Sequence, residues 1–245
     1  MAKMDDYRKK LRGFESWDAY LLQESGLPGP RGNLELAQVV ADQGDAALFE
    51  RYLTYNAGLA PTNSPYEFLA FCGLVGLGRL LAEGQTGWLD TIRLSASDRR
   101  WRLREGVAMA LQRLGDVNMD LLIHEMQGWS TGNRLEQRAA AAALCEPRLL
   151  GQMEQARAVL EILDNITASL RESEDRKSEG FRALRKGLGY CWSVAVVAAP
   201  VEGKKLMEKW LADPDKDVRW IMQQNLKKNR LVRMDAGWVE LWKSK

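Results

Sequence analysis

The chain has little of the chemistry that most catalytic sites need. Its 245 residues include a single histidine, His124. The segment His124-Glu125-Met126-Gln127-Gly128 begins like a zinc protease motif, but Gly128 stands where the second histidine ligand must fall on the same helix face. Zinc hydrolysis of that type is therefore excluded. A Ser-His-Asp or Cys-His site would also have to use His124, and the sequence contains neither a nucleophile elbow nor a P-loop.

Cysteine is scarce as well. Cys72, Cys145 and Cys191 lie far apart in apolar stretches, with no C-x-x-C pair and an odd total. A disulfide framework needs paired cysteines, and a structural zinc site needs closely spaced ligands. We therefore expect three buried thiols in a reducing compartment, and we predict no catalytic residue, no metal and no cofactor.

The chain has no excess of charge of either sign. Lys and Arg total 35 against 33 Asp and Glu, which gives a net charge of +2. Nucleic-acid binders usually carry a basic excess, because neutralising phosphates supplies most of their affinity. Any basic surface on this protein would have to be local.

Long apolar runs are also lacking. The two most apolar windows, 68–78 and 190–201, each run about eleven residues, whereas about twenty are needed to cross a bilayer. The first fourteen residues are rich in charge and have no apolar segment behind them, unlike a signal peptide. We expect a cytoplasmic protein without a membrane partner.

What the chain does contain is a repeated helix opening. It occurs as Asp98-Arg99-Arg100-Trp101-Arg102-Leu103-Arg104 and as Asp213-Pro214-Asp215-Lys216-Asp217-Val218-Arg219, each followed by an apolar stripe that ends at Leu111 or Leu226. Asp98 and Asp213 stand where N-caps are expected, and Pro214 fits a first helical turn. A recurring unit of this kind predicts stacked helical hairpins, which bury their apolar faces against their neighbours.

Helical spacing recurs along the whole chain and strand alternation is almost absent, so the predicted fold class is all-α. Turn residues delimit the expected helices, which are 4–25, 34–42, 45–57, 64–82, 87–95, 99–114, 117–128, 133–145, 149–170, 175–198, 201–211, 214–230 and 235–242. The pattern predicts one α-α superhelical domain over 1–245. Its N-terminal helix and loop occupy 1–30, and about six stacked helix pairs occupy 31–245.

Small residues crowd three of these helices. They are Gly73, Gly76 and Gly78 in one, Ala139 to Ala143 in another, and Gly187 with Gly189 in a third. A glycine inside a helix costs about 1 kcal/mol relative to alanine. We therefore expect the backbones of neighbouring helices to approach closely at these positions.

The Asp-x-x-x-x-(Leu/Val)-Arg opening with its stripe resembles the first helix of a HEAT repeat, in the armadillo-like superfamily of α-solenoids. The resemblance covers 98–129 and 213–242, is weaker over 133–170, and before residue 64 depends on helix pairing alone. In such repeats the Asp and Arg usually form a hydrogen-bonded ladder between hairpins. The resemblance implies that role for Asp98, Arg104, Arg138, Asp213 and Arg219.

A narrower resemblance links the helix from Val218 to Arg230, with the tryptophan-rich composition, to the HEAT-like DNA alkylation-repair glycosylases. That family depends on an aspartate beside tryptophans in a concave basic cleft. Trp17-Asp18 and Trp88-Leu89-Asp90 are candidates for that constellation by composition only.

Trp220 is the tryptophan that the pattern sets apart, because it lies on the helix side opposite Val218, away from the apolar stripe. An aromatic ring among amides and cations can stack a base or anchor a peptide, although the sequence favours packing against the adjoining hairpin. Two basic clusters lie near Trp101 and near the C-terminus. The possible nucleic-acid contacts are Arg99, Arg100, Arg102, Trp220, Gln224, Lys227 and Lys228.

The leading hypothesis is a non-catalytic HEAT-like scaffold that binds a protein partner on its concave face, which is built from the second helix of each pair. The candidate contacts are the polar or amphipathic residues of those helices, namely Arg51, Tyr55, Arg93, His124, Gln127, Arg157 and Lys205. Nucleic-acid binding, with or without base excision, is the alternative, and an enzyme of another kind is a third.

Overall fold

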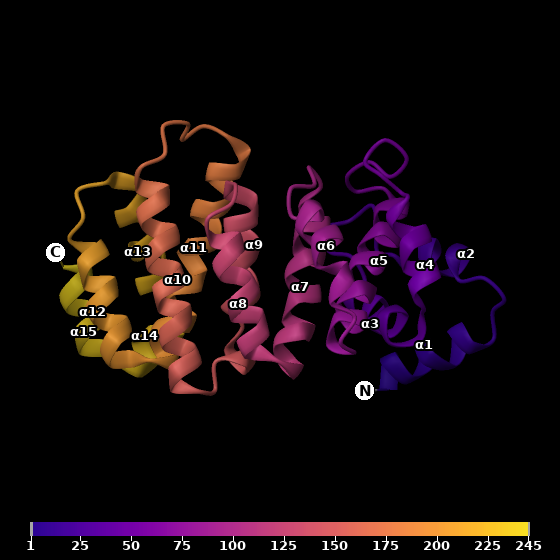
Figure 1. Cartoon of the computed structure of the whole chain (residues 1–245), viewed down its shortest axis with the longest axis horizontal. Helices are drawn as coiled ribbons and strands as arrows, with labels where there is room; N and C mark the ends of the chain where they lie inside the picture. Colours follow the sequence, from indigo (N-terminus) through magenta and orange to yellow (C-terminus); the bar gives the residue numbers. More distant parts are fainter. Residues whose placement is uncertain (1, 245) are drawn as a thin grey trace. The chain divides into compact units, whose positions relative to one another are not determined.

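The computed structural model describes residues 2–244, and this part of the chain contains fifteen α-helices, two short 3₁₀ helices and no β-strand (Figure 1). The predicted all-α class is confirmed. The chain divides into two compact units, unit 1 (Met1–Val117) and unit 2 (Asn118–Lys245). The division falls inside the helix pair that the sequence predicts over 99–114 and 117–128.

Unit 1 is organised around one apolar helix, α5, which contacts α2, α3, α4 and α7. The helices of this unit are α1 (Ala2–Arg12), α2 (Asp18–Glu24), α3 (Leu34–Gln43), α4 (Ala46–Leu53), α5 (Pro65–Ala82), α6 (Leu89–Ser95) and α7 (Trp101–Val117), with a 3₁₀ turn at Thr86–Trp88. The predicted helix 4–25 is in fact two helices, α1 and α2, because residues 13–17 are not helical.

The length of α5 exceeds the apolar window counted from the sequence. The helix has 18 residues and is long and apolar enough to cross a membrane, as core helices of other proteins also are. In this protein 78% of it is buried inside the fold. Ser64 caps it by accepting a hydrogen bond from the Glu67 N–H, while the Glu67 carboxylate accepts one from the Asn63 N–H. The helix ends at Ala82, and Gly84, two residues further on, has a φ of +89° that favours glycine.

Glycines on α5 allow the close helix approach that the sequence predicts. A Cβ on Gly78 would lie 2.4 Å from the Ala110 Cα of α7. A Cβ on Gly76 would lie 2.4 Å from the Phe49 ring of α4, and one on Gly73 would lie 2.9 Å from the Phe49 carbonyl oxygen. Side chains at these positions would push neighbouring helices away from α5.

Unit 2 consists of two helix layers. Its helices are α8 (Met119–Ser130), α9 (Arg134–Leu144), α10 (Met153–Arg171), α11 (Glu179–Ala198), α12 (Pro200–Leu211), α13 (Lys216–Leu226), α14 (Asn229–Met234) and α15 (Ala236–Lys243), with a 3₁₀ turn at Pro147–Leu149. In one layer α10 contacts α8 and α12, and in the other α11 contacts α9 and α13. Consecutive helix pairs therefore lie side by side within this unit. Trp129, Trp192 and Trp210 fill its interior.

The caps of the two repeated openings differ from the prediction. Asp213 is not the N-cap of α13. That role belongs to Asp215, whose side chain accepts from the N–H groups of Asp217 and Val218, so Pro214 precedes the helix. Asp213 instead accepts from the Asp215 N–H at 2.8 Å, and Asp98 likewise accepts from the Arg100 N–H at 2.7 Å. Both openings thus share a turn in which an aspartate binds the amide two residues on. The predicted helix 214–230 also breaks after Leu226.

Candidate functional site

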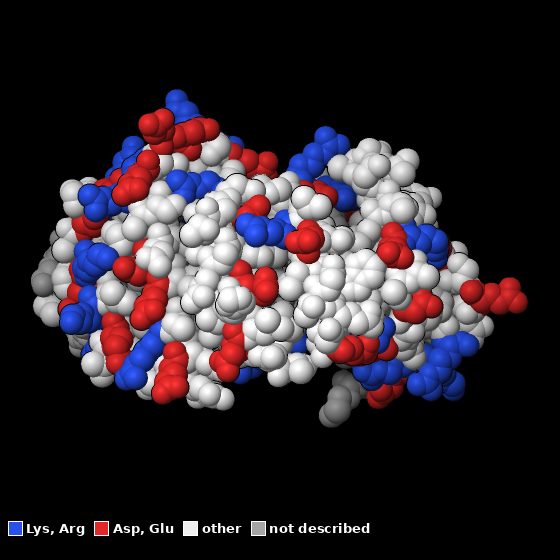
Figure 2. All heavy atoms as spheres, viewed as in Figure 1, with Lys and Arg blue, Asp and Glu red and all other residues white. Residues whose placement is uncertain are grey.

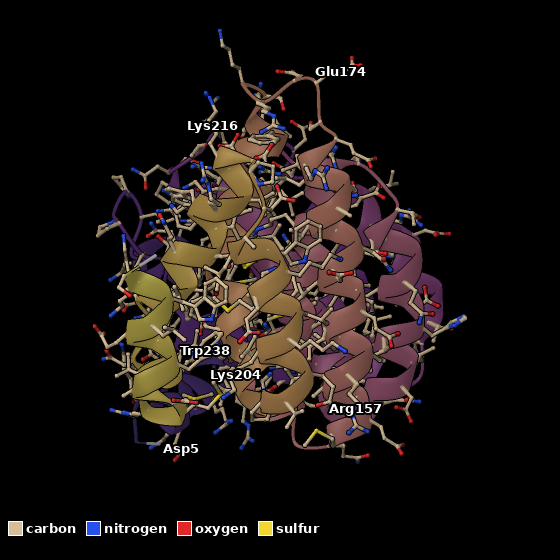
Figure 3. The ribbon with its side chains drawn as sticks, turned by 90° about the vertical axis from the view of Figure 1, so that its left-hand side faces the viewer. Asp5, Arg157, Glu174, Lys204, Lys216 and Trp238 are labelled. Atoms are coloured by element: carbon tan, nitrogen blue, oxygen red, sulfur yellow. The ribbon has the colours of Figure 1, made fainter. Side chains whose placement is uncertain are left out.

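Four predicted contact residues lie in one helix layer of unit 2. His124 and Gln127 are exposed on α8, Arg157 is exposed on α10, and Lys205 is exposed on α12. Because α10 contacts both of the other helices, these side chains occupy one continuous surface, which we call the α8–α10–α12 surface. Figure 3 shows Arg157 on α10 near the lower end of this layer.

Polar bridges join the helices of the α8–α10–α12 surface. Gln155 on α10 donates to Asp120 on α8 at 2.9 Å, and the Arg157 guanidinium lies 2.7 Å from Glu202 on α12. The pKa of Glu202 is lowered by its own backbone N–H in the first turn of α12 and by Arg157. These bridges fix the spacing of the exposed side chains.

Further along the same layer, Asp164 on α10 accepts from Lys209 at 3.0 Å and from the Trp210 indole N–H at 2.6 Å. Over unit 2, in the left half of Figure 2, Lys and Arg side chains are interspersed with Asp and Glu side chains. A partner of this surface would need mixed charge too, since complementary potentials decide which partners fit.

The predicted contacts in unit 1 are largely engaged within the fold. Arg51 holds Asp18 through two hydrogen bonds of 2.6 and 2.8 Å, and the Tyr52 hydroxyl donates to the same carboxylate. The hydrogen bond from Arg51 lowers the pKa of Asp18 despite partial burial. The Tyr55 ring stacks on Tyr66 with centroids 5.8 Å apart. Arg93 is half-buried on α6.

The aspartates suggested by the glycosylase resemblance lie in different settings. Asp18 is paired with Arg51, and the neighbouring Trp17 donates its indole N–H to the Leu11 carbonyl. Asp90 is exposed on α6, beside the half-buried Trp88.

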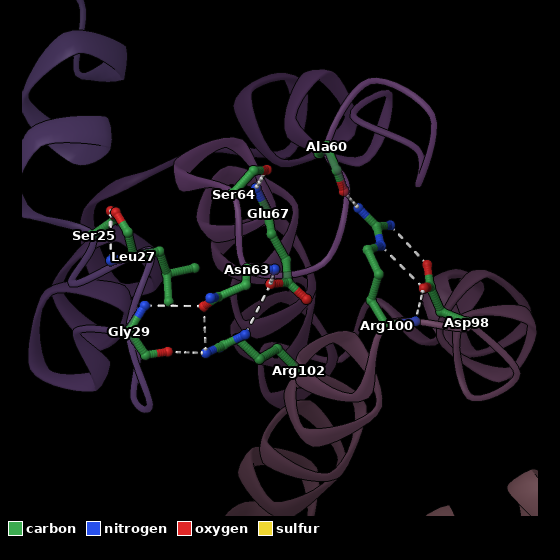
Figure 4. A network of polar contacts seen from close by, with 10 residues as sticks. All are labelled: Ser25, Leu27, Gly29, Ala60, Asn63, Ser64, Glu67, Asp98, Arg100 and Arg102. Atoms are coloured by element: carbon green, nitrogen blue, oxygen red, sulfur yellow. Dashed lines mark hydrogen bonds and ion pairs between the residues drawn. The ribbon is translucent and has the colours of Figure 1, made fainter. Parts of the chain in front are cut away.

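Arg100 corrects the prediction of a basic surface before α7, because it is 4% exposed. It binds the Asp98 carboxylate at 2.7 and 3.0 Å and donates to the carbonyls of Tyr55 at 2.8 Å and Ala60 at 3.1 Å (Figure 4). Partial burial raises the pKa of Asp98, but the hydrogen bonds from Arg100 outweigh it and the pKa is lowered. Arg100 ties the loop after α4 to the start of α7 and is not available to a phosphate.

Arg102 is likewise buried, at 6% exposed, and is the second correction. Its guanidinium contacts the fully buried Glu67 at 3.1 Å and donates to the Gly29 carbonyl and the Asn63 side chain (Figure 4). Loop carbonyls and a buried carboxylate need donors, which explains why these arginines point inward. Only Arg99 of the three predicted arginines is exposed, and it donates to the Ala57 carbonyl.

Trp220 packs against the adjoining hairpin and is also partly exposed to solvent. It is half-buried against α11, where the Arg185 guanidinium carbon lies 3.7 Å from the ring centroid and Gly189 leaves room for the indole and for Gln224. It also lines an open hollow of about 510 Å³ with Arg185, Lys216, Asp217, Arg219 and Gln223. Lys227 is exposed, whereas Lys228 is half-buried and its amine lies 5.6 Å from the Tyr190 ring centroid.

Several arginines bind aspartate or carbonyl oxygens at the two openings. Arg104 donates to the Asp98 carbonyl at 2.7 Å, within the same helix start. Asp213 pairs with Arg171 of α10 at 3.4 Å, and Arg219 is exposed. Arg176 instead binds both Asp215 and Asp217, at 2.6 and 2.9 Å.

The remaining reactive side chains do not converge. His124 is exposed on α8, and within residues 2–244 no group of three or more His, Cys, Asp or Glu side chains is placed to hold a metal ion. All three cysteines are buried free thiols. Burial raises the pKa of Cys72 and Cys145, the latter with help from a hydrogen bond to Cys191.

No protein-family model matches the chain, and no curated protein is significantly similar in sequence. The HEAT-repeat resemblance therefore stays a prediction.

Proposed function

We propose that the chain is a HEAT-like α-solenoid scaffold of the cytoplasm that binds a protein partner through the second helices of its pairs. The observation that carries the proposal is the α8–α10–α12 surface, where helices from consecutive pairs lie side by side and expose His124, Gln127, Arg157 and Lys205. A long surface of this kind suits protein recognition and needs no catalytic cleft. The buried free thiols suit a reducing compartment.

The bridges across the surface support the same role. Arg157–Glu202 and Gln155–Asp120 link neighbouring helices and restrain the side chains that form them. Preorganised side chains lose less conformational freedom on binding, which strengthens association. Arg51 and Arg93 remain proposed contacts on the second helices of unit 1, although Arg51 is already paired with Asp18. Tyr55 remains a proposed contact too, but it lies in the loop after α4, because the helix predicted over 45–57 ends at Leu53.

The test is affinity capture from the native cell with matched charge reversals. Lys205→Glu changes the charge of the proposed surface, and Arg157→Glu also removes the bridge to Glu202. Lys186→Glu is the control, because Lys186 is exposed on α11 in the other layer. We expect one reproducible partner whose recovery falls about fivefold or more with the surface variants.

The control variant should retain the partner at the wild-type level. Equal recovery by all variants, or recovery of chaperones alone, would contradict the proposal. Circular dichroism and thermal unfolding verify that each variant is folded.

A second candidate, nucleic-acid binding, rests on α13, where the exposed Lys216 and Arg219 line the hollow beside Trp220 and the exposed Lys227 follows the end of the helix. If these cations neutralise phosphates, binding of single-stranded or duplex oligonucleotides should weaken steeply with salt, and Lys227→Ala should lower the salt slope by about 1. Lys186→Ala, on α11, is the control. No binding at low salt removes this candidate.

A further inference from the structure

The open hollow beside Trp220 lies between α11 and α13, on helices other than those of the α8–α10–α12 surface. Three of its lining side chains are cations, namely Arg185 of α11 with Lys216 and Arg219 of α13. One lining side chain, Asp217, is a carboxylate, so the lining has a net charge of +2. This charge favours an anionic occupant.

Arg185 is held in place by its neighbours in the fold. Its guanidinium carbon lies 3.7 Å from the Trp220 ring centroid, and its Nε lies 2.8 Å from an Asp217 carboxylate oxygen. The Nε is buried, but 27% of the side chain is exposed. Within residues 2–244 the two terminal nitrogens have no hydrogen-bond acceptor. A fixed guanidinium with free terminal nitrogens binds the oxygens of an anion at little conformational cost.

Lys216 and Arg219 are also available to a ligand. Both are exposed, and neither side chain has an ion pair or a hydrogen bond to any residue that the structure describes. The first amides of α13 are not part of the site, because Asp215 already accepts from the N–H groups of Asp217 and Val218. The hollow therefore attracts anions through side chains whose charge the fold leaves unpaired.

A phosphate monoester matches this charge best. Its charge at neutral pH is about −1.5 to −2, whereas a carboxylate, a sulfate monoester and each internal phosphodiester of a nucleic acid carry a single negative charge. The hollow of about 510 Å³ is open, whereas pockets for free small molecules usually enclose most of the ligand. An open hollow suits a phosphate that is presented by a larger molecule.

We propose that this hollow binds a phosphorylated side chain of a protein partner. Arg185 and Arg219 donate to the phosphate oxygens, and Lys216 adds positive charge. Trp220 and Gln223 contact the group that carries the phosphate. The site shares Lys216 and Arg219 with the nucleic-acid candidate but does not depend on it, and it lies outside the α8–α10–α12 surface.

The test uses three capped pentapeptides, Gly-Gly-X-Gly-Gly, in which X is phosphotyrosine, sulfotyrosine or tyrosine. Sulfotyrosine has nearly the same shape as phosphotyrosine but one negative charge fewer. Binding is measured at low salt by titration with the ¹H–¹⁵N spectrum of the full chain, including the tryptophan indole and arginine Nε–H signals. We expect the phosphotyrosine peptide to bind one-to-one and about fivefold more tightly than the sulfotyrosine peptide, because one more charge meets the cations. The tyrosine peptide should not bind.

Substitutions at exposed residues locate the binding. The double variant Lys216→Ala with Arg219→Ala removes two cations that make no contact within the fold, so it should fold and weaken phosphotyrosine peptide binding about tenfold or more. Lys205→Ala, at an exposed residue of α12 in the other layer, should leave the affinity unchanged. Inorganic phosphate should bind more weakly than the peptide, because it lacks the contacts to Trp220 and Gln223.

Four results would overturn the proposal. They are no binding of the phosphotyrosine peptide at low salt, equal affinity for the phosphotyrosine and sulfotyrosine peptides, unchanged binding by the folded double variant, and inorganic phosphate binding as tightly as the peptide. Displacement of the peptide by a lower concentration of a single-stranded thymidine octamer would assign the hollow to nucleic acid and also contradict the proposal. None of these results bears on partner capture through the α8–α10–α12 surface, so the two proposals fail separately.

Discussion

Unit 1 and unit 2 differ in how deeply they bury the arginines that bind their loops. Unit 1 buries charged arginines, because Arg100 and Arg102 lie under the loops that precede α5 and α7. In unit 2 the corresponding ionic network, Arg176 with Asp215 and Asp217, is partly exposed, with 29% of the Arg176 side chain accessible. The same sequence phrase thus opens α7 and α13, but the surrounding loops decide whether its charges become interior supports or surface pairs.

The difference has an energetic consequence. Removing one partner of a buried ion pair leaves an uncompensated charge in a poorly solvated site, whereas water replaces the lost partner of an exposed pair. Unit 1 should therefore depend much more strongly on its arginines than unit 2 does. The predictions below follow from this contrast, beginning with the largest effect.

Arg102→Met should destabilise unit 1 by about 3–5 kcal/mol, because Glu67 would remain buried without its guanidinium. Hydrogen exchange followed by mass spectrometry should show loss of protection in α5 and α7, with unit 2 peptides little affected. Arg99→Met, at the exposed neighbour, should change stability by no more than about 0.5 kcal/mol. Similar losses of stability in Arg102→Met and Arg99→Met would contradict the expected difference between buried and exposed arginines.

Gly78→Ala should cost about 1–3 kcal/mol, since its Cβ would lie 2.4 Å from the Ala110 backbone and α5 would have to move away from α7. Gly128→Ala on α8 is the matched control. A Cβ there meets no atom within 4 Å, so improved helix propensity should stabilise unit 2 by up to about 1 kcal/mol. Urea unfolding of both variants measures the loss of stability expected for Gly78→Ala and the gain expected for Gly128→Ala.

Arg176→Met in unit 2 should cost about 1–2 kcal/mol, less than Arg102→Met, because 29% of the Arg176 side chain is accessible and Asp217 keeps a second cation, Arg185, at 2.8 Å. The cost should shrink as salt is raised from low to about 1 M, because salt screens partly exposed charges. The cost of Arg102→Met should be nearly insensitive to salt. If the stability costs of Arg176→Met and Arg102→Met depended equally on salt, burial would not explain the difference between the two ion pairs.

Acid should weaken both units modestly through aspartates held by arginine. Hydrogen bonds from Arg51 lower the pKa of Asp18, and those from Arg176 lower the pKa of Asp215. A carboxylate with a lowered folded-state pKa stabilises the protein above its unfolded pKa near 4, and the stabilisation is lost as pH falls through the folded-state pKa. Unfolding by urea between about pH 6 and pH 3 measures this slope.

Asp18→Asn and Asp215→Asn should each flatten that slope, in unit 1 and unit 2 respectively. Asp90→Asn, at an exposed carboxylate of α6, should leave it unchanged. An unchanged slope in both of the first two variants would remove these pairs as the source of acid sensitivity.

Much of the helix layout could be predicted from the sequence, because apolar periodicity and capping residues act locally. The helix expected over 133–145 is α9, Arg134–Leu144, with Asn133 as its cap. The errors occur where several residues compete for one role. Asp213 and Asp215 both suit the cap of α13, and only the structure shows which one binds the first amides of the helix.

The buried polar contacts were less predictable, because they join segments that are distant in the sequence. Nothing near Arg102 in the sequence reveals that Glu67, thirty-five residues earlier, will be its partner. The exposed residues of the α8–α10–α12 surface were easier to predict, because an amphipathic helix places polar residues on its outer side wherever it packs. Residues 31–34, α5 and α7 together line a cavity of about 230 Å³ beside Trp101, and the sequence could not predict it because these segments are far apart along the chain.

Each unit contains at least one buried cysteine whose labelling rate can report how often that unit opens. Cys72 lies in α5, while Cys145 and Cys191 lie in unit 2, and all three are shielded from solvent. An alkylating reagent can reach them only when the surrounding helices separate, so the labelling rate at each cysteine reports how often that half opens. The unmodified chain thereby allows the two openings to be timed separately in one sample, without an introduced probe.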